Sequence, residues 1–259
     1  MKSTQARLDR FIRKLTHKTP KEIRQLLLAK RIRIDGEIAT TMNQQVTQFS
    51  VVCVDQDMIQ NNLPVYIMLH KPKGVVSATK DDKHTTVIDL IDHERKHELH
   101  IAGRLDFNSS GLLLLTNDGN WSRRLSTPKT QVHKRYHVQL AKHITPEYVT
   151  KFEEGIYFAY EDITTRPAHL IITSDVTAQV SLTEGRYHQI KRMFGYFQNE
   201  VLALHRFAIG NLPLDKNLMP GESRVLTVEE AHAIFDNNTS KTLEKNTSSC
   251  QTFGGRMPT

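Results

Sequence analysis

A run of four leucines at 112–115, set between polar segments, constrains the fold of this 259-residue chain more than any other stretch. A short apolar run of this kind is typical of a strand that is buried on both faces. The mostly polar residues 107–110 just before it predict a loop, and glycines lie on both sides of the leucine run. The pattern therefore places the charged residues Arg104 and Asp106 on a loop that a rigid, buried strand supports.

Asp106 has two interpretations at this point. Loops carried by rigid strands hold the reactive carboxylates of many enzymes, so Asp106 is a candidate catalytic group. The alternative is a structural aspartate in a turn, paired with Arg104 two positions earlier. This stretch alone favours neither interpretation.

The composition is that of an ordinary globular protein. Charged residues make up 24% and hydrophobic residues 38%, and the length allows a substantial core in one or two domains. No apolar run approaches the roughly 18 residues that a membrane span needs, so we expect no membrane partner. The two cysteines, Cys53 and Cys250, are too far apart in sequence for a disulfide framework or a CxxC metal site. We therefore expect a reducing, cytoplasmic setting.

The positive charge of the chain is concentrated at its N-terminal end. The net charge is +7, and residues 1–35 carry eleven Lys and Arg against three acidic residues. So basic an end predicts a polyanionic partner. Residues 1–18 lack the apolar segment of a secretory signal and only partly fit a mitochondrial presequence, so we interpret them as folded structure.

The first part of the chain predicts two short basic helices followed by a hairpin. Apolar residues recur at helical spacing over 8–15, with basic residues on the other faces. Thr19 and Glu22 have the spacing of a capping box at the start of a second helix over 20–30. The Asp-Gly pair at 35–36 lies between alternating apolar residues and is a strong hairpin signal.

This arrangement, closed by a strand at 51–54, resembles the S4 RNA-binding module over residues 5–55. The resemblance implies that exposed cations bind the phosphates and the shape of an RNA more than its sequence. The alternative is a solvated pair of basic helices that binds nothing. The expected RNA contacts in this part are Arg7, Arg10, Lys14, Arg24, Lys30, Arg31 and Arg33.

The remainder of the chain alternates strands and helices. The runs predict strands at 65–69, 134–140, 168–172, 178–182, 201–204 and 225–226, and helices at 121–125, 146–154, 188–196 and 228–235. The turn at 70–74 is basic, so Lys71 and Lys73 are either phosphate contacts or part of a plain turn. Tyr136, in the strand at 134–140, either packs inward or offers its hydroxyl to a site.

One motif points to a different chemistry. Residues 93–97 match the HExxH pattern, in which two histidines on one face of a helix bind zinc. Here Arg95 and Lys96 lie between the histidines and would repel a dication, and no convincing third ligand follows. We expect no metal, and a zinc hydrolase remains only an alternative.

Three motifs in order, GRLDFNSSGLLLLTNDG, KRYHV and EGRYHQIKRMFG, resemble those of the RsuA family of pseudouridine synthases. The segments HKPKG, ALHRFAIGNLPLD and PGESRVLT match as well, and the resemblance covers nearly all of residues 5–235. Ser109 is a mild departure, since the family usually has Thr there. The form EGRYHQIKRMF is most similar to family members that modify uridine 516 of 16S ribosomal RNA.

The resemblance implies an isomerase that makes pseudouridine without a cofactor. Asp106 corresponds to the catalytic aspartate, Tyr136 to the active-site tyrosine, and Lys191 to the basic residue that pairs with the aspartate. Arg104 corresponds to an arginine thought to fill the space of the flipped nucleotide. Further RNA contacts are expected from Lys71, Lys73, Arg186 and Arg192.

The expected architecture is α+β: an S4-like module over 1–60, a synthase domain over 61–235 with a mixed, mainly antiparallel sheet and flanking helices, and a disordered polar tail over 236–259. The expected partner is 16S ribosomal RNA or a small-subunit assembly intermediate, bound by a monomer without a nucleotide cofactor. Two alternatives to this interpretation remain. One is a synthase acting on large-subunit (23S) ribosomal RNA, and the other is a non-catalytic S4-type ribosome-assembly factor.

Overall fold

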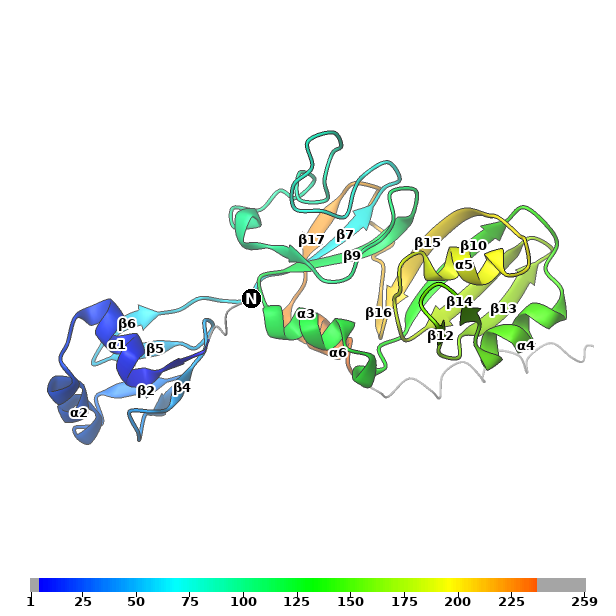
Figure 1. Cartoon of the computed structure of the whole chain (residues 1–259). Helices are drawn as coiled ribbons and strands as arrows, with labels where there is room; N and C mark the ends of the chain where they lie inside the picture. Colours follow the sequence, from blue (N-terminus) through cyan, green and yellow to red (C-terminus); the bar gives the residue numbers. More distant parts are fainter. Residues whose placement is uncertain (1–4, 237–259) are drawn as a thin grey trace, which may run out of the picture. The chain divides into compact units, whose positions relative to one another are not determined.

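The computed structural model describes residues 5–236, and the chain divides into two compact units, Met1–Pro64 and Val65–Thr259 (Figure 1). Each unit has a hydrophobic core of its own. The tail expected over 236–259 lies outside the described residues, apart from Asp236. None of the helices in the described part of the chain has the length and apolarity that crossing a membrane requires.

The N-terminal unit packs two helices against a small antiparallel sheet in the order β3-β2-β5-β6. A short strand pair, β1 with β4, joins the start of the first helix to the loop before the sheet closes. The elements are β1 (Ala6–Arg7), α1 (Leu8–Thr16), α2 (Pro20–Leu28), β2 (Ile32–Ile34), β3 (Glu37–Ile38), β4 (Gln45–Val46), β5 (Val52–Val54) and β6 (Asp57–Gln60).

Local signals set the ends of these elements. The capping box predicted at the start of α2 is confirmed: the Thr19 hydroxyl accepts from the Glu22 amide, and the Glu22 carboxylate accepts from the Thr19 amide at 2.7 Å. The hairpin is confirmed too, with Asp35 and Gly36 both at positive φ (51° and 87°) between β2 and β3. Leu15, the last apolar residue of the helical spacing over 8–15, is 47% exposed.

The larger unit is built on a nine-stranded sheet in the order β13-β14-β10-β15-β9-β7-β17, with β16 and β8 paired at its sides. Its strands are β7 (Tyr66–Lys71), β8 (His100–Ile101), β9 (Ser110–Thr116), β10 (Lys134–Leu140), β11 (Tyr157–Phe158), β12 (Ile163–Thr164), β13 (His169–Ser174), β14 (Thr177–Leu182), β15 (Val201–Ile209), β16 (Leu212–Pro213) and β17 (Ser223–Val225), of which β11 and β12 form a separate pair. Its helices are α3 (Gly119–Ser126), α4 (Pro146–Glu154), α5 (Gln189–Gly195) and α6 (Val228–Ala233), with short 3₁₀ turns at Lys96–Glu98 and Pro128–Thr130.

The predicted sheet type is confirmed. All strand pairs of the large sheet are antiparallel except that of β9 with β15, so the sheet is mixed and mainly antiparallel. Because β9 and β15 are far apart in sequence, this parallel pair joins two halves of the sheet that the chain builds separately.

Strand β9 is buried on both faces, as the four leucines predict. Leu113 and Leu115 pack into the core cluster on one side of the sheet, while Leu112 and Leu114 pack into the cluster on the other side. All four side chains are fully buried. Strands covered on both faces lose the usual alternation and appear as continuous apolar runs.

Close backbone packing at Gly111 sets the distance between β9 and β15. Gly111 has φ of +110° and pairs with Arg206, and a Cβ atom at position 111 would lie 2.2 Å from the Arg206 carbonyl oxygen. Any other residue would force the two strands apart. Glycine at 111 therefore holds the loop that precedes β9 against the strand that carries Arg206.

Candidate active site

A buried lysine binds the backbone of the loop that carries Asp106. Lys71, at the end of β7, is fully buried, and its ammonium group donates to four backbone carbonyls. These are the carbonyls of Pro72 (2.9 Å), Asp106 (3.1 Å), Phe107 (3.4 Å) and Ser109 (2.8 Å). Burial lowers the pKa of Lys71 to about 8, and the neighbouring Asp106 carboxylate opposes this shift. The side chain thus fixes the loop in place.

The prediction that Lys71 contacts RNA is therefore wrong. A phosphate cannot reach an ammonium group that lies inside the protein with its hydrogen-bond donors already directed to carbonyls. Lys73, two positions later, has an exposed side chain, and its role as a phosphate contact stays a prediction. Of the two lysines in this short turn, Lys71 is therefore buried and Lys73 is exposed to solvent.

The Asp106 carboxylate faces two side chains from the segment around α5. Lys191 Nζ lies 3.4 Å from one carboxylate oxygen, and His188 Nε2 lies 3.4 Å from the other. The structure thus brings together Asp106 and Lys191, which lie far apart in sequence. His188 was not among the expected site residues, although it belongs to the third motif, EGRYHQIKRMFG.

A buried carboxylate shapes the turn that presents His188 and Lys191. Glu184 is 8% exposed, and it accepts hydrogen bonds from the Gln189 side chain (2.6 Å) and from the Arg166 amide (2.9 Å). His188 adopts a left-handed conformation (φ 49°), after which α5 begins at Gln189. The turn and the helix therefore hold both side chains toward Asp106.

A small pocket of about 150 Å³ lies beside Asp106. Tyr136 on β10 and Arg206 on β15 are opposite each other in the strand register, and both line it. Arg206 is 2% exposed and donates to the Leu112 carbonyl (2.8 Å), to the Arg104 carbonyl (3.4 Å) and to the Tyr136 hydroxyl (3.5 Å). The further lining residues include Ser109, Ser126, Lys134 and Gln189.

Arg206 and Lys134 are site residues that the sequence did not single out. Burial together with repulsion from Arg206 lowers the pKa of Lys134 to about 8, while attraction to Glu184 opposes the shift. One signal was present for Arg206: it takes an inward position in an otherwise apolar alternation, between buried Leu204 and Ala208. A charged residue at such a position needs a special partner.

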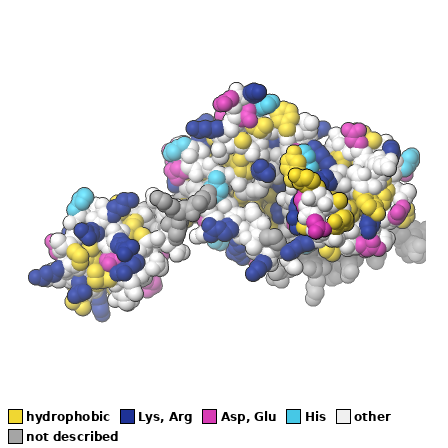
Figure 2. All heavy atoms as spheres, viewed as in Figure 1, with side chains coloured by type: hydrophobic (Ala, Val, Ile, Leu, Met, Phe, Trp, Pro, Cys, Tyr) yellow, Lys and Arg dark blue, Asp and Glu magenta, His cyan; other side chains and the backbone are white. Residues whose placement is uncertain are grey.

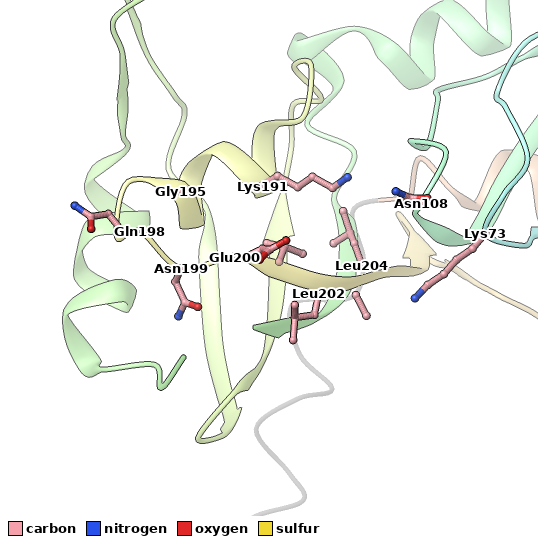
Figure 3. Close-up of a pocket in the computed structure, with 11 residues that line it drawn as sticks. Lys73, Asn108, Lys191, Gly195, Gln198, Asn199, Glu200, Leu202 and Leu204 are labelled. Atoms are coloured by element: carbon pink, nitrogen blue, oxygen red, sulfur yellow. The ribbon is translucent and has the colours of Figure 1, made fainter. Parts of the chain in front are cut away.

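A wider cleft of about 700 Å³ borders this pocket, and Lys191 lines both (Figure 3). In Figure 3, Lys191 extends from α5 toward Asn108, and Lys73 lies on the far side of the same cleft. The start of β15, Val201 to Leu204, supplies further lining. A cleft bordered by Lys73 and Lys191 that adjoins a small pocket suits a chain-like anionic substrate with one group inserted.

The remaining cations expected at the catalytic unit are partly engaged. Arg192 forms a bidentate ion pair with Glu161 and lies 3.7 Å from the Phe158 ring centroid. Arg186 pairs with Glu184 at 3.2 Å. The side chain of Arg104 is exposed and lies at the pocket, where its backbone carbonyl accepts from Arg206.

The cations expected in the N-terminal unit all have exposed side chains: Arg7, Arg10, Lys14, Arg24, Lys30, Arg31 and Arg33. Figure 2 shows Lys and Arg side chains spread over the visible face of this unit. Arg31 is bound by Asp55 and Arg7 by Asp9, so these two are less available to an outside anion.

The HExxH segment does not have the geometry that its zinc-binding form requires. Residues 93–97 form a turn and the start of a 3₁₀ helix, and the Arg95 amide donates to His93 Nδ1 at 3.0 Å. Within residues 5–236, no group of three His, Cys, Asp or Glu side chains is arranged to hold a metal ion.

Comparison with known proteins gives this site its class. A family description of RNA pseudouridylate synthases matches residues 65–196. A solved structure of a pseudouridylate synthase has a TM-score of 0.64 and 36% identity, covering 88% of this chain and 99% of that one. The chain belongs to the RNA pseudouridylate synthase family, and it is an enzyme of that class.

Relatives narrow the class to the RsuA type. The chain is 45% identical over 225 residues to the ribosomal small subunit pseudouridine synthase A of Pseudomonas aeruginosa, covering 86% of this chain and 98% of that protein. It is 40% identical over 229 residues to the protein of the same name in Vibrio cholerae, covering 88% and 99%. The resemblance inferred from the motifs is confirmed.

We expect Lys71→Met to lower the saturating rate of pseudouridine formation about 100-fold or more, because a loop shifted by about 1 Å misplaces Asp106. RNA affinity should stay nearly unchanged, since Lys71 is buried. Single-turnover rates and equilibrium RNA binding measure the two effects.

Lys73→Met is the matched control, since Lys73 lies in the same turn but is exposed. It should weaken RNA binding and leave the saturating rate in place. A Lys71→Met protein that binds RNA poorly but reacts at the normal rate would contradict the role of Lys71 in holding the Asp106 loop.

Proposed function

We propose that this enzyme converts one uridine of small-subunit (16S) ribosomal RNA, uridine 516, into pseudouridine, with Asp106 as the reacting carboxylate. The observation that carries the proposal is the place of Asp106, between Lys191 and His188 at the edge of a small pocket lined by Tyr136. The names of the relatives support the small-subunit target. Their coverage of nearly the whole chain supports a shared substrate class.

The reaction needs a carboxylate and no cofactor. The bond between C1′ and N1 of uridine breaks, the base turns, and C5 bonds to C1′, so the product keeps every atom. Asp106 attacks C1′ or assists loss of the base by elimination at C2′, and both routes need its anion. Positive charge on Lys191 attracts and stabilises that anion.

Tyr136 and Arg104 take the supporting roles. The Tyr136 hydroxyl lies in the pocket, where it moves a proton at C2′ or, after the base rejoins, at C5. The target must first leave its base stack, which costs a few kcal/mol. Arg104, exposed beside the pocket, offsets part of this cost by filling the vacated space. Closure of the pocket by RNA keeps out water, which would otherwise hydrolyse the sugar intermediate.

The N-terminal unit is proposed to be an S4-like RNA-binding module. Its two helices pack on a small sheet, and its exposed cations are distributed over both helices and the hairpin. Such a surface binds phosphates and RNA shape without reading sequence. A large-subunit target, or RNA binding without catalysis, remains an outcome of the tests below.

We expect Asp106→Asn to abolish tritium release from C5 of 16S RNA labelled with [5-³H]uridine, because the neutral amide is no nucleophile. RNA binding should persist. Asp175→Asn is the control, since the Asp175 side chain is 83% exposed on a turn of the sheet. Release near the wild-type rate by Asp106→Asn would remove Asp106 from its role.

Replacing Arg10, Lys14 and Arg24 together by Gln should weaken RNA binding and flatten its salt dependence by about 0.7 in log–log slope for each lost contact. No ion pair involves these three side chains in the described part of the chain. Arg31→Gln is the control, because Asp55 already binds Arg31. An unchanged slope in the triple variant would exclude the S4-like role.

A further inference from the structure

Two buried polar atoms in the small pocket have no partner. Among buried side-chain nitrogen and oxygen atoms of residues 5–236, only Ser109 Oγ and Arg206 Nη2 make no hydrogen bond. Both residues are at least 98% buried, and both line the pocket beside Asp106. Leaving such groups unsatisfied costs stability, so each calls for an explanation. A ligand that enters the pocket supplies one.

Lys134 adds a cation that has no ion-pair or hydrogen-bond partner among the described residues. Its side chain lines the same pocket and is 9% exposed, yet within the described residues its ammonium group takes part in no hydrogen bond and no ion pair. The nearby Glu184 carboxylate is turned to Gln189, Arg166 and Arg186 instead. A buried lysine that lacks a counter-ion is rare in a folded protein.

The strand geometry directs these groups to one place. Lys134 and Tyr136 are alternate residues of β10 and therefore lie on one face, and Tyr136 is the register partner of Arg206 on β15. The register shifts between Arg135 and Tyr136, so that Phe207 is an extra residue on β15. Bulges of this kind re-aim side chains beside active sites.

We propose that Arg206 and Lys134 form an oxyanion site that binds a carbonyl oxygen of the uracil base as it detaches from the sugar. This inference rests on the proposed function and assigns a new binding site within it. Among the described residues that line the pocket, the one acidic side chain is that of Asp106 at its edge, against five Lys and Arg side chains: Arg104, Lys134, Arg186, Lys191 and Arg206. The missing partner is therefore an acceptor that becomes negative during the reaction.

The electron balance of the reaction supplies that acceptor. When C1′–N1 breaks, the bonding electron pair stays on N1, and the base becomes an anion whose charge spreads to its carbonyl oxygens. In one route C1′ bonds to the Asp106 carboxylate, and C5 later displaces that carboxylate from C1′. In the other route C2′ loses a proton to give a C1′=C2′ double bond, and C2′ regains a proton as C5 bonds to C1′. In both routes a proton leaves C5 and another is taken up at N1, so nothing is oxidised or lost. Donors placed in advance stabilise such a developing charge most effectively.

A phosphate of the RNA backbone offers the same anionic oxygens. The burial of the donors favours the uracil base over a backbone phosphate as the ligand. Arg206 is 2% exposed, whereas the side chain of Asp106 at the pocket edge is 26% exposed. A group that reaches Arg206 Nη2 must enter the pocket, as the flipped base does. The backbone phosphates are served by exposed cations such as Lys73 and Arg104.

The test compares two substrates in single-turnover reactions with saturating enzyme. One RNA carries uridine at the target, and the other carries 5-fluorouridine, whose fluorine withdraws electrons and makes the base a better leaving group. Loss of the parent nucleoside from digested RNA reports cleavage of its glycosidic bond. Lys134→Met is the principal variant and Lys134→Arg is its charge-conserving control.

We expect Lys134→Met to react with uridine RNA about 100-fold or more slowly than wild type, the usual loss when an oxyanion donor is removed. With 5-fluorouridine RNA the loss should be clearly smaller, because a better leaving group needs less help. RNA affinity should not change, and Lys134→Arg should recover part of the rate. The melting temperature of Lys134→Met should be equal or higher, since a largely buried cationic side chain without an ion-pair partner is removed.

Three results would overturn the oxyanion site while leaving the proposed function intact. They are an unchanged rate in Lys134→Met, an equal loss on both substrates, and a loss that appears only as weaker RNA binding, which would assign Lys134 to a phosphate. Wild-type enzyme that leaves uridine unchanged in all ribosomal RNA would instead refute the proposed function itself. Arg206→Lys is a second variant, read on the same two substrates, and its folding is checked separately because Arg206 also holds two backbone carbonyls.

Discussion

The catalytic unit depends on the close approach of two backbones at Gly111 and Arg206. This parallel contact between β9 and β15 joins two halves of the sheet. One half carries the Asp106 loop, and the other carries Tyr136, Arg206 and the turn that leads into α5. The site exists because these halves meet, and the absence of a side chain at position 111 sets how closely they do so.

Two buried cations then determine the shape of the Asp106 loop. Lys71 donates hydrogen bonds to the carbonyls of Asp106, Phe107 and Ser109, and Arg206 donates to those of Arg104 and Leu112. A buried charge is tolerated only where hydrogen bonds compensate for the lost water. The loop carbonyls provide these hydrogen bonds. Because they do so, the loop is fixed in one conformation, in which the Asp106 carboxylate contacts Lys191 and His188. Arg206 therefore both holds the loop and lines the pocket beside Asp106.

Local features of the sequence were enough to predict much of the fold. The leucine run, the capping box at Thr19 and the Asp-Gly hairpin each involve residues that are neighbours in the chain, so their physics is visible without the fold. The pairing of Asp106 with Lys191 was inferred only through family resemblance. The prediction that Lys71 contacts RNA was wrong, because a lysine in a short basic turn has the sequence pattern of a surface residue. Its burial depends on a loop that arrives some thirty-five positions later in the chain.

We propose that Asp106 makes pseudouridine at one position of small-subunit ribosomal RNA. The most direct measurement maps pseudouridine across all ribosomal RNA from cells that lack this gene and from the same cells complemented with wild type or with Asp106→Asn. We expect the loss of a single pseudouridine, at position 516 of 16S RNA, which wild type restores and Asp106→Asn does not. An unchanged map, a loss confined to 23S RNA, or restoration by Asp106→Asn would contradict this proposal.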